Sequence, residues 1–215
     1  MTGVAWLAMG AAAAFAIGNW TAVLRGHRRL EYVCKPAVMV ALVVSALALD
    51  PVDDVQRAWF VVALLLSLAG DVFLMLPEER SEYLFVAGLG SFLLGHLAYI
   101  GGFAARGFDW SGHWWGLLLV PVIIWFAGVP IVRSARTADR ALTVPVAAYV
   151  GVILAMLVCA VASGVALAAV GAAVFVVSDA TLGWNRFVKP LAHGPIVVIS
   201  TYHVAQALLV VSLTV

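Results

Sequence analysis

The chain has 215 residues, of which 65% are hydrophobic and 11% are charged, and its mean hydropathy is +1.09. Soluble domains carry roughly 25% charged residues, so this composition excludes an ordinary soluble fold and indicates a protein that crosses the membrane several times. The net charge of +1 is neither strongly basic nor strongly acidic, so we expect no nucleic-acid partner.

Eight stretches are apolar over about the 20 residues that a membrane-spanning helix needs. In chain order they are Val4–Leu24, Val33–Leu49, Ala58–Leu76, Tyr83–Ala104, Trp114–Val132, Leu142–Val161, Val165–Leu182 and Gly194–Thr214. Only Ala162, Ser163 and Gly164 separate the sixth stretch from the seventh, and a Ser-Gly pair suits a turn. The sequence therefore predicts an all-α, polytopic membrane protein with eight transmembrane helices in one domain over residues 1–215.

The basic residues are unevenly distributed in this arrangement. With eight spans, the first, third, fifth and seventh loops share one face. That face collects ten of the twelve basic residues, namely Arg25, Arg28, Arg29, Lys35, Arg80, Arg133, Arg136, Arg140, Arg186 and Lys189, and the opposite face receives Arg57 and Arg106. Cytoplasmic loops are rich in Lys and Arg. We therefore expect an integral protein of a bacterial-type plasma membrane with both termini outside the cytoplasm.

Two aspartates lie inside predicted spans. Asp71, in SLAGDVFLML, is five residues from the cytoplasmic end of the third span, and Asp179, in FVVSDATLGWNRF, is three residues from the same end of the seventh. Ionisable side chains are rare within a membrane and usually face the bundle interior or a wet cavity. We therefore expect both aspartates to lie near one pocket.

Other polar residues extend this predicted site. Lys35 at the start of the second span and Asn19 late in the first share the depth of the aspartates, while His96 and His203 lie nearer the midplane. The expected picture is a funnel that opens to the cytoplasm, with a polar wall and an apolar floor. The steps from Asp71 to Asp179 and from His96 to His203 are 108 and 107 residues, which suggests a parallel four-plus-four internal repeat.

Several motifs resemble one known family. They are Lys35-Pro36, Gly70-Asp71, the run GLGSFLLGHLAYI from 88 to 100, Ser178-Asp179, and Thr201-Tyr202 followed by Gln206. In order and spacing they are similar to the YhhN-type integral membrane family, which includes the animal lysoplasmalogenases. The resemblance runs from about Lys35 to the C-terminus. It implies about eight spans and hydrolysis of the vinyl-ether bond of lysoplasmalogens to a fatty aldehyde and a glycerophospho-base. The two aspartates of the family fall on Asp71 and Asp179.

The implied chemistry needs an acid and a negative group in unlike surroundings. Protonation of the β-carbon of a vinyl ether gives an oxocarbenium ion, which water captures as a hemiacetal. Two carboxyl groups can divide these roles when their environments differ. Asp71 has apolar neighbours in sequence, while Asp179 follows Ser178 and lies near Asn185. We therefore expect Asp71 to be the acid and Asp179 the base or cation stabiliser.

The remaining candidate residues would bind the substrate, a lysophospholipid, with membrane lipid around it. Lys35 and Arg186 would hold the phosphate, or their side chains would extend to lipid phosphates without a specific role. Tyr202 and Gln206, one turn apart, would orient a water or tie two helices together. His96 and His203 would line the site or be buried core groups. Asn19 would lie on the polar wall, and Asn185 would contact the substrate or cap the seventh span.

Two other functions suit parts of the same pattern. A zinc hydrolase needs about three converging nitrogen or carboxylate ligands. Asp71, Asp179, His96 and His203 offer such groups, but the chain has no HExxH or HxxxH motif, so we expect no metal and no other cofactor. A proton-coupled transporter of a small molecule or lipid would also use intramembrane carboxylates. A purely structural membrane protein would leave the two aspartates unexplained.

Overall fold

The computed structural model describes residues 1–76 and 81–215, and of residues 81 and 82 the backbone alone. Within these residues eight helices are long and apolar enough to cross a membrane, in the order that the sequence predicts. The fold class is confirmed as an all-α polytopic membrane protein. The internal repeat stays a prediction.

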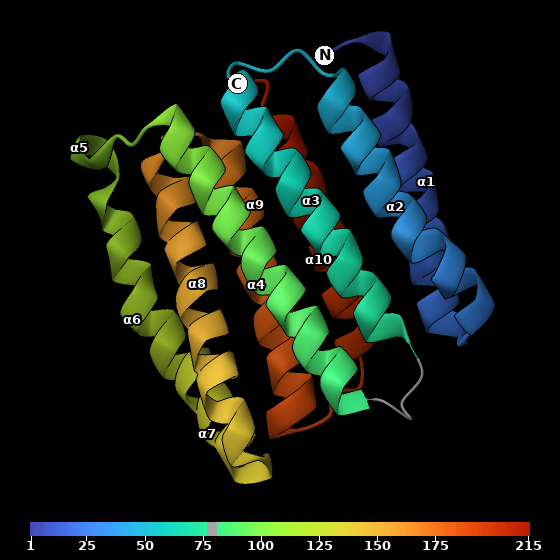
Figure 1. The fold of residues 1–215 in the computed structure, drawn as a ribbon, viewed down its shortest axis with the longest axis vertical. Helices are drawn as coiled ribbons and strands as arrows, with labels where there is room; N and C mark the ends of the chain where they lie inside the picture. The colour runs from blue at the N-terminus through green and yellow to red at the C-terminus, as the bar shows by residue number, and fades with distance from the viewer. Residues whose placement is uncertain (77–80) are drawn as a thin grey trace.

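Seven of the spans are formed mainly by one regular helix each. These are α1 (Gly3–Arg25), α2 (Arg28–Ala48), α3 (Asp54–Met75), α4 (Ser81–Arg106), α8 (Thr143–Ala162), α9 (Ala166–Gly183) and α10 (Gly194–Ser212). Figure 1 shows α1 and α2 at one edge of the bundle, with α3, α4, α9 and α10 in the middle and α8 beyond them. Sequential helices pack as antiparallel pairs, α1 with α2, α3 with α4 and α9 with α10.

The fifth span differs from the others because its helical geometry changes along its length. It runs through α5 (Trp110–His113), the 3-10 turn η2 (Trp114–Leu118), α6 (Leu119–Ile123), the π turn η3 (Ile124–Gly128) and α7 (Val129–Ala138), and the short 3-10 turn η4 (Arg140–Leu142) leads into α8. A second π turn, η5 (Trp184–Val188), extends α9. Such π turns inside helices frequently lie at functional sites.

The turns between spans follow from local residue chemistry. The Thr2 hydroxyl accepts a hydrogen bond from the Ala5 amide at 3.1 Å and donates to the Ala48 carbonyl at 2.6 Å, which caps α1 and ties it to the end of α2. Gly164 adopts φ 73° between α8 and α9, a left-handed conformation that glycine reaches without a steric penalty. The predicted division at Ser163-Gly164 is therefore confirmed.

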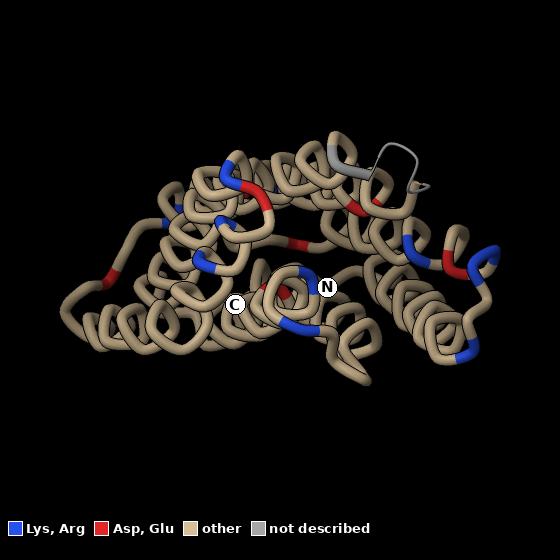
Figure 2. Tube along the Cα trace, turned by 90° about the horizontal axis from the view of Figure 1, so that it is seen from below, with Lys and Arg blue, Asp and Glu red and all other residues tan. Residues whose placement is uncertain are grey.

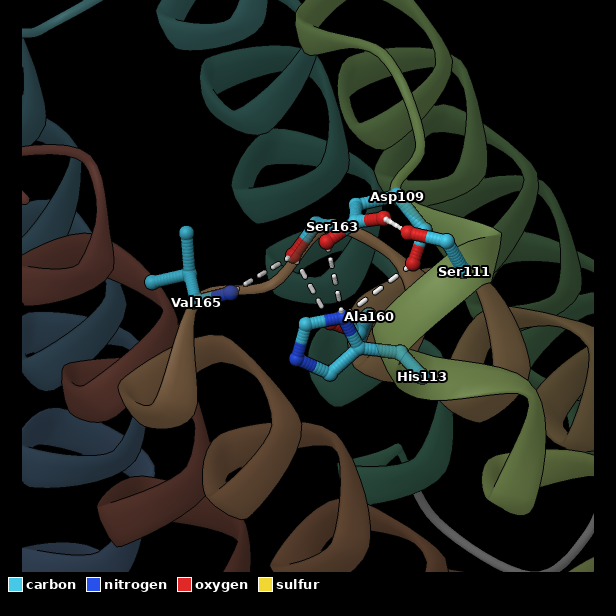
Figure 3. A network of polar contacts seen from close by, with 6 residues as sticks. All are labelled: Asp109, Ser111, His113, Ala160, Ser163 and Val165. Atoms are coloured by element: carbon cyan, nitrogen blue, oxygen red, sulfur yellow. Dashed lines mark hydrogen bonds and ion pairs between the residues drawn. The ribbon is translucent and has the colours of Figure 1, made fainter.

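A polar network fixes the start of the fifth span against the turn between α8 and α9 (Figure 3). The Asp109 amide donates to the Ala162 carbonyl at 2.7 Å. In Figure 3 the Ser111 hydroxyl donates to Asp109 Oδ1, at 2.6 Å. The hydrogen bond from Ser111 lowers the pKa of the Asp109 carboxyl. His113 contacts the Asp109 carbonyl oxygen through Nδ1 at 3.1 Å.

Both termini lie at the same end of the bundle, and the first, fifth and seventh loops lie at the other (Figure 1). Figure 2 views the molecule from the latter end, with Lys and Arg in blue. Arg80, one of the ten basic residues assigned to this face, is outside the described residues. The two-sided arrangement of loops agrees with the predicted spans, and the side of the membrane on which each end lies stays a prediction.

Candidate functional site

Asp71 is the centre of a buried ion pair. Its Oδ1 lies 3.1 Å from Lys35 Nζ, and the two side chains are 2% and 14% exposed. The Tyr202 hydroxyl donates to Asp71 Oδ2 at 2.8 Å and contacts Met39 Sδ at 3.3 Å. Helices α2, α3 and α10 thus each contribute to one charge-paired cluster, in which the Lys35 ammonium favours the ionised form of the carboxyl.

Asp179 has a different set of partners, on α4 and α8. The Tyr149 hydroxyl donates to Asp179 Oδ2, and His96 Nε2 lies 3.8 Å from the same oxygen. Among the described residues, no Lys or Arg lies within ion-pair distance of Asp179. The Nε2 atom of the buried His96 has no hydrogen-bond partner in the described part of the chain. Among the described residues, this cluster therefore has an aspartate with no cationic side chain within ion-pair distance and an imidazole whose Nε2 lacks a hydrogen-bond partner.

A layer of aromatic rings lies between the two aspartate clusters. Phe175 packs edge-on against His96 at 4.7 Å and against Tyr202 at 5.6 Å between ring centroids. His96 also packs edge-on against Tyr149, and Phe92 against Tyr202. Each aspartate therefore contacts this layer through the tyrosine to which it is hydrogen-bonded.

Glycine and serine neighbours in the motifs explain how the aspartates are held. A Cβ built on Gly70 would lie 2.6 Å from the Phe92 ring, so this position needs glycine for α4 to pack beside Asp71. The Ser178 hydroxyl donates to the Val198 carbonyl on α10 at 2.9 Å. This bond fixes the rotation of α9 next to Asp179. In each pair, the residue before the aspartate therefore fixes its helix against a neighbour: Gly70 allows close packing, and Ser178 forms a hydrogen bond.

An apolar pocket extends from Asp179 toward the end of the bundle that carries the basic loops. It contains about 750 Å³ of empty space, part of it open to the surroundings. Its walls come from α3, α4, the fifth span, α8, α9 and η5, and both π turns border it. Asp179 and Tyr149 lie along it, and Arg186 lies in η5, seven residues after Asp179, or roughly 10 Å along the helix. The Arg186 guanidinium lies 4.9 Å from the centre of the Phe85 ring.

The structure distributes the predicted site residues over several places. Asp179, Arg186 and His96 lie in or beside the pocket, whereas Lys35, Asp71 and Tyr202 form the ion-paired cluster. Gln206 accepts a hydrogen bond from Tyr99, and the Asn185 side chain accepts one from the Leu191 amide at 2.8 Å in the loop after η5. Asn19 is fully buried, with no hydrogen-bond partner among the described residues. His203 accepts a hydrogen bond from Trp20.

Three partner residues were not singled out from the sequence. Tyr149, Tyr99 and Trp20 hydrogen-bond to Asp179, Gln206 and His203 respectively. Aromatic residues in apolar spans carry no signal of such a role, because only tertiary packing decides which hydroxyl or indole group meets a polar partner. Within the described residues, no three His, Cys, Asp or Glu side chains lie close enough together to hold a metal ion.

Comparison with known proteins shows that the chain is similar to the members of one family. The sequence pattern of the YhhN family matches residues 30–213. The chain is 36% identical to human lysoplasmalogenase TMEM86B over 150 residues, and this alignment covers 70% of the chain and 61% of the human protein. It is 34% identical over 170 residues to the lysoplasmalogenase of Mycobacterium bovis, covering 77% of this chain and 63% of the relative. The chain therefore spans less than two thirds of the length of these relatives. No solved structure matches this chain.

Proposed function

Since the chain belongs to the YhhN family, we propose that it is a membrane-embedded hydrolase that cleaves the vinyl-ether bond of lysoplasmalogens. The products are a fatty aldehyde and a glycerophospho-base. The observation that carries this proposal is the pocket between apolar walls. It is lined by Asp179, which has no Lys or Arg within ion-pair distance among the described residues, and by Arg186, which lies nearer the basic end of the bundle. An apolar pocket of this kind suits the single hydrocarbon chain of a lysolipid.

Asp179 is the acid of the proposed reaction. Burial favours the neutral form of a carboxyl, whereas a nearby ammonium favours the anion. Asp179 lies between apolar walls and hydrogen-bonds to Tyr149, while Asp71 contacts Lys35 at 3.1 Å. This difference supports the reverse of the assignment that we expected from the sequence, with Asp179 rather than Asp71 holding the transferable proton.

The reaction begins when the Asp179 carboxyl donates its proton to the β-carbon of the vinyl ether. The π electrons of the double bond form the new C–H bond and leave an oxocarbenium ion, which the Asp179 carboxylate stabilises. Water adds to the α-carbon and returns a proton to Asp179, giving a hemiacetal. Cleavage of the bond to the glycerol oxygen, with transfer of the hemiacetal hydroxyl proton to that oxygen, releases aldehyde and glycerophospho-base.

His96 positions the water. Its Nε2 lies 3.8 Å from Asp179 Oδ2, too far for a direct hydrogen bond but suitable for one bridging water molecule. The buried Nε2, which has no partner among the described residues, needs such a ligand, because an unsatisfied buried polar group is unfavourable. His96 thereby holds the nucleophile next to the carboxylate that receives its proton.

Arg186 binds the phosphate. It lies roughly 10 Å from Asp179 toward the basic loops, and its guanidinium can form two parallel hydrogen bonds with phosphate oxygens. Lys35 is unsuited to this task because its ammonium is already paired with Asp71 inside the bundle. The Lys35–Asp71–Tyr202 cluster acts as a positioning group, since Tyr202 packs against the aromatic layer behind the pocket.

The test is aldehyde formation by purified protein in detergent supplied with a lysoplasmalogen. Mass spectrometry should detect fatty aldehyde, and in D2O the aldehyde should carry one deuterium on the carbon next to the carbonyl, where the acid delivers its proton. Asp179→Asn should reduce turnover at least about 100-fold, as expected for loss of a general acid. Asp50→Asn, on an exposed carboxylate, is the matched control. A folded parent protein that forms no aldehyde would refute the proposal.

A further inference from the structure

Arg186 reaches the pocket from the last turn of the seventh span. This turn is η5, in which the Lys189 amide donates to the Trp184 carbonyl, five residues back, at 3.0 Å. Two consecutive side chains of η5 meet one partner on α4: the Arg186 guanidinium lies 4.9 Å from the centre of the Phe85 ring, and the Phe187 ring packs edge-on against it at 5.8 Å. Arg186 is otherwise exposed. The backbone of η5 therefore determines whether its guanidinium lies at the pocket or elsewhere on the surface.

The side chain of Asn185, the residue before Arg186, joins η5 to the loop that follows it. Its Oδ1 accepts a hydrogen bond from the Leu191 amide at 2.8 Å. A Cβ built on Gly194, the first residue of α10, would lie 2.7 Å from the same oxygen. Asn185 is not among the residues that line the pocket. Its carboxamide thus fills the space between η5, the loop and the start of α10, and it contacts the loop instead of the pocket.

We propose that Asn185 is a positioning residue for the phosphate of the substrate. By binding the loop, it holds η5 in the conformation that keeps the Arg186 guanidinium at the pocket, and it does not itself touch the lipid. The inference rests on the proposed function, which assigns the phosphate to Arg186. Preference for a lysophospholipid over the same chain without phosphate thus depends on a residue outside the pocket.

The test is the binding of two uncleavable lipids to the full chain in detergent, measured by isothermal titration calorimetry. One is a lysophosphatidylcholine with a saturated alkyl-ether chain, and the other is the alkylglycerol with the same chain and no phosphate. Asn185→Ala should raise the Kd of the first lipid roughly fivefold, the effect of one neutral hydrogen bond, and leave that of the second unchanged. In an Arg186→Met background the same substitution should have no further effect, because a residue that acts through another gives a non-additive double variant.

A second variant disturbs the same contact from the other side. Gly194→Ala would place its Cβ against Asn185 Oδ1 and displace the flexible end of that side chain from the Leu191 amide. It should raise the Kd of the lysophospholipid as Asn185→Ala does, and the two substitutions together should do no more than either alone. His193→Ala is the matched control, since His193 is exposed in the same loop and its side chain does not cap α10. Thermal unfolding shows that each variant is folded.

Several outcomes would overturn the proposal. They are an unchanged Kd in Asn185→Ala, additive effects of Asn185→Ala and Arg186→Met, an equal loss of alkylglycerol binding, and a parent protein that binds both lipids equally or binds neither. Binding of these lipids does not depend on turnover. A parent protein that forms no aldehyde from a lysoplasmalogen but shows the expected binding pattern would therefore refute the proposed function and leave the role of Asn185 standing.

Discussion

At the scale of single residues, the two aspartates differ in what surrounds them more than in how deeply they lie. Asp71 has an ammonium and a tyrosine hydroxyl as partners, whereas Asp179 has a tyrosine hydroxyl and an imidazole beyond direct bonding distance. A buried charge whose partner is removed is strongly destabilising, whereas loss of a neutral hydrogen-bonding group has a smaller effect. The two residues should therefore respond differently to the same substitution.

Asp71→Asn should lower the free energy of unfolding by about 3–5 kcal/mol, because Lys35 would be left as a buried charge without its partner. The double variant Lys35→Met with Asp71→Leu should recover most of this loss, since an apolar pair of similar volume replaces the ion pair. Thermal unfolding in detergent measures the stability of the single and the double variant. If Asp71 is a positioning residue, the double variant should retain reduced but measurable turnover. Complete inactivity of this stable variant would instead make Asp71 part of the chemistry.

Arg186→Met should raise KM for a lysoplasmalogen by about 10- to 100-fold, the range expected when a charge-assisted hydrogen bond is lost. The same variant should process an alkenylglycerol without phosphate as well as the parent does, because that substrate has no group for the guanidinium to bind. Lys189→Met removes the same charge from an exposed position that does not line the pocket, and steady-state kinetics should show little change. An equal effect of both substitutions would point to general attraction of anionic lipid.

At the scale of elements, the residue at which each helix begins or ends determines how far a polar side chain lies from the end of its span. The sequence predicted the second span from Val33 and the seventh up to Leu182, but α2 begins at Arg28 and η5 continues α9 to Val188. Lys35 is therefore seven residues into its helix, roughly 10 Å deep, and Asp179 is nine residues from the end of its span. Hydropathy identifies an apolar run, but it does not detect the polar turns by which the helix extends beyond that run. The spans and the aspartates were thus predictable, whereas the Lys35–Asp71 pairing was not.

The close packing of α3 and α4 gives a prediction at this scale. Gly70→Ala would place a Cβ 2.6 Å from the Phe92 ring, and we expect a loss of about 1–3 kcal/mol from overpacking together with lower turnover, because Phe92 lines the pocket. Adding Phe92→Leu should restore stability. Gly90→Ala, on α4 with open space around the built Cβ, should be neutral or slightly stabilising through helix propensity. Thermal unfolding and aldehyde formation are the two measurements.

At the scale of the whole molecule, the central helices α3 and α9 carry the two aspartates, and α2 and α8 on either side contribute Lys35 and Tyr149 to their clusters. The fifth span closes the pocket from outside, and its outer face exposes Trp125 and Phe126 by 72% and 71%, as expected for side chains in contact with lipid. One irregular helix therefore separates the pocket from the bilayer. The proposed substrate and the fatty aldehyde product are lipids that can enter and leave from the bilayer, whereas water and the glycerophospho-base need a path to the aqueous phase.

The orientation of this bundle determines which leaflet supplies the pocket. Its basic end should face the cytoplasm, so an impermeant thiol reagent applied to intact cells should label Val52→Cys at the end that carries the termini. His27→Cys, between α1 and α2 at the other end, should react only after lysis. Both positions are exposed and neither substitution removes a Lys or Arg, so the orientation signal is preserved. Cys34 and Cys159 would be replaced by alanine beforehand. The opposite labelling pattern would mean that Arg186 faces the outer leaflet, and the lysolipid would then have to come from that side.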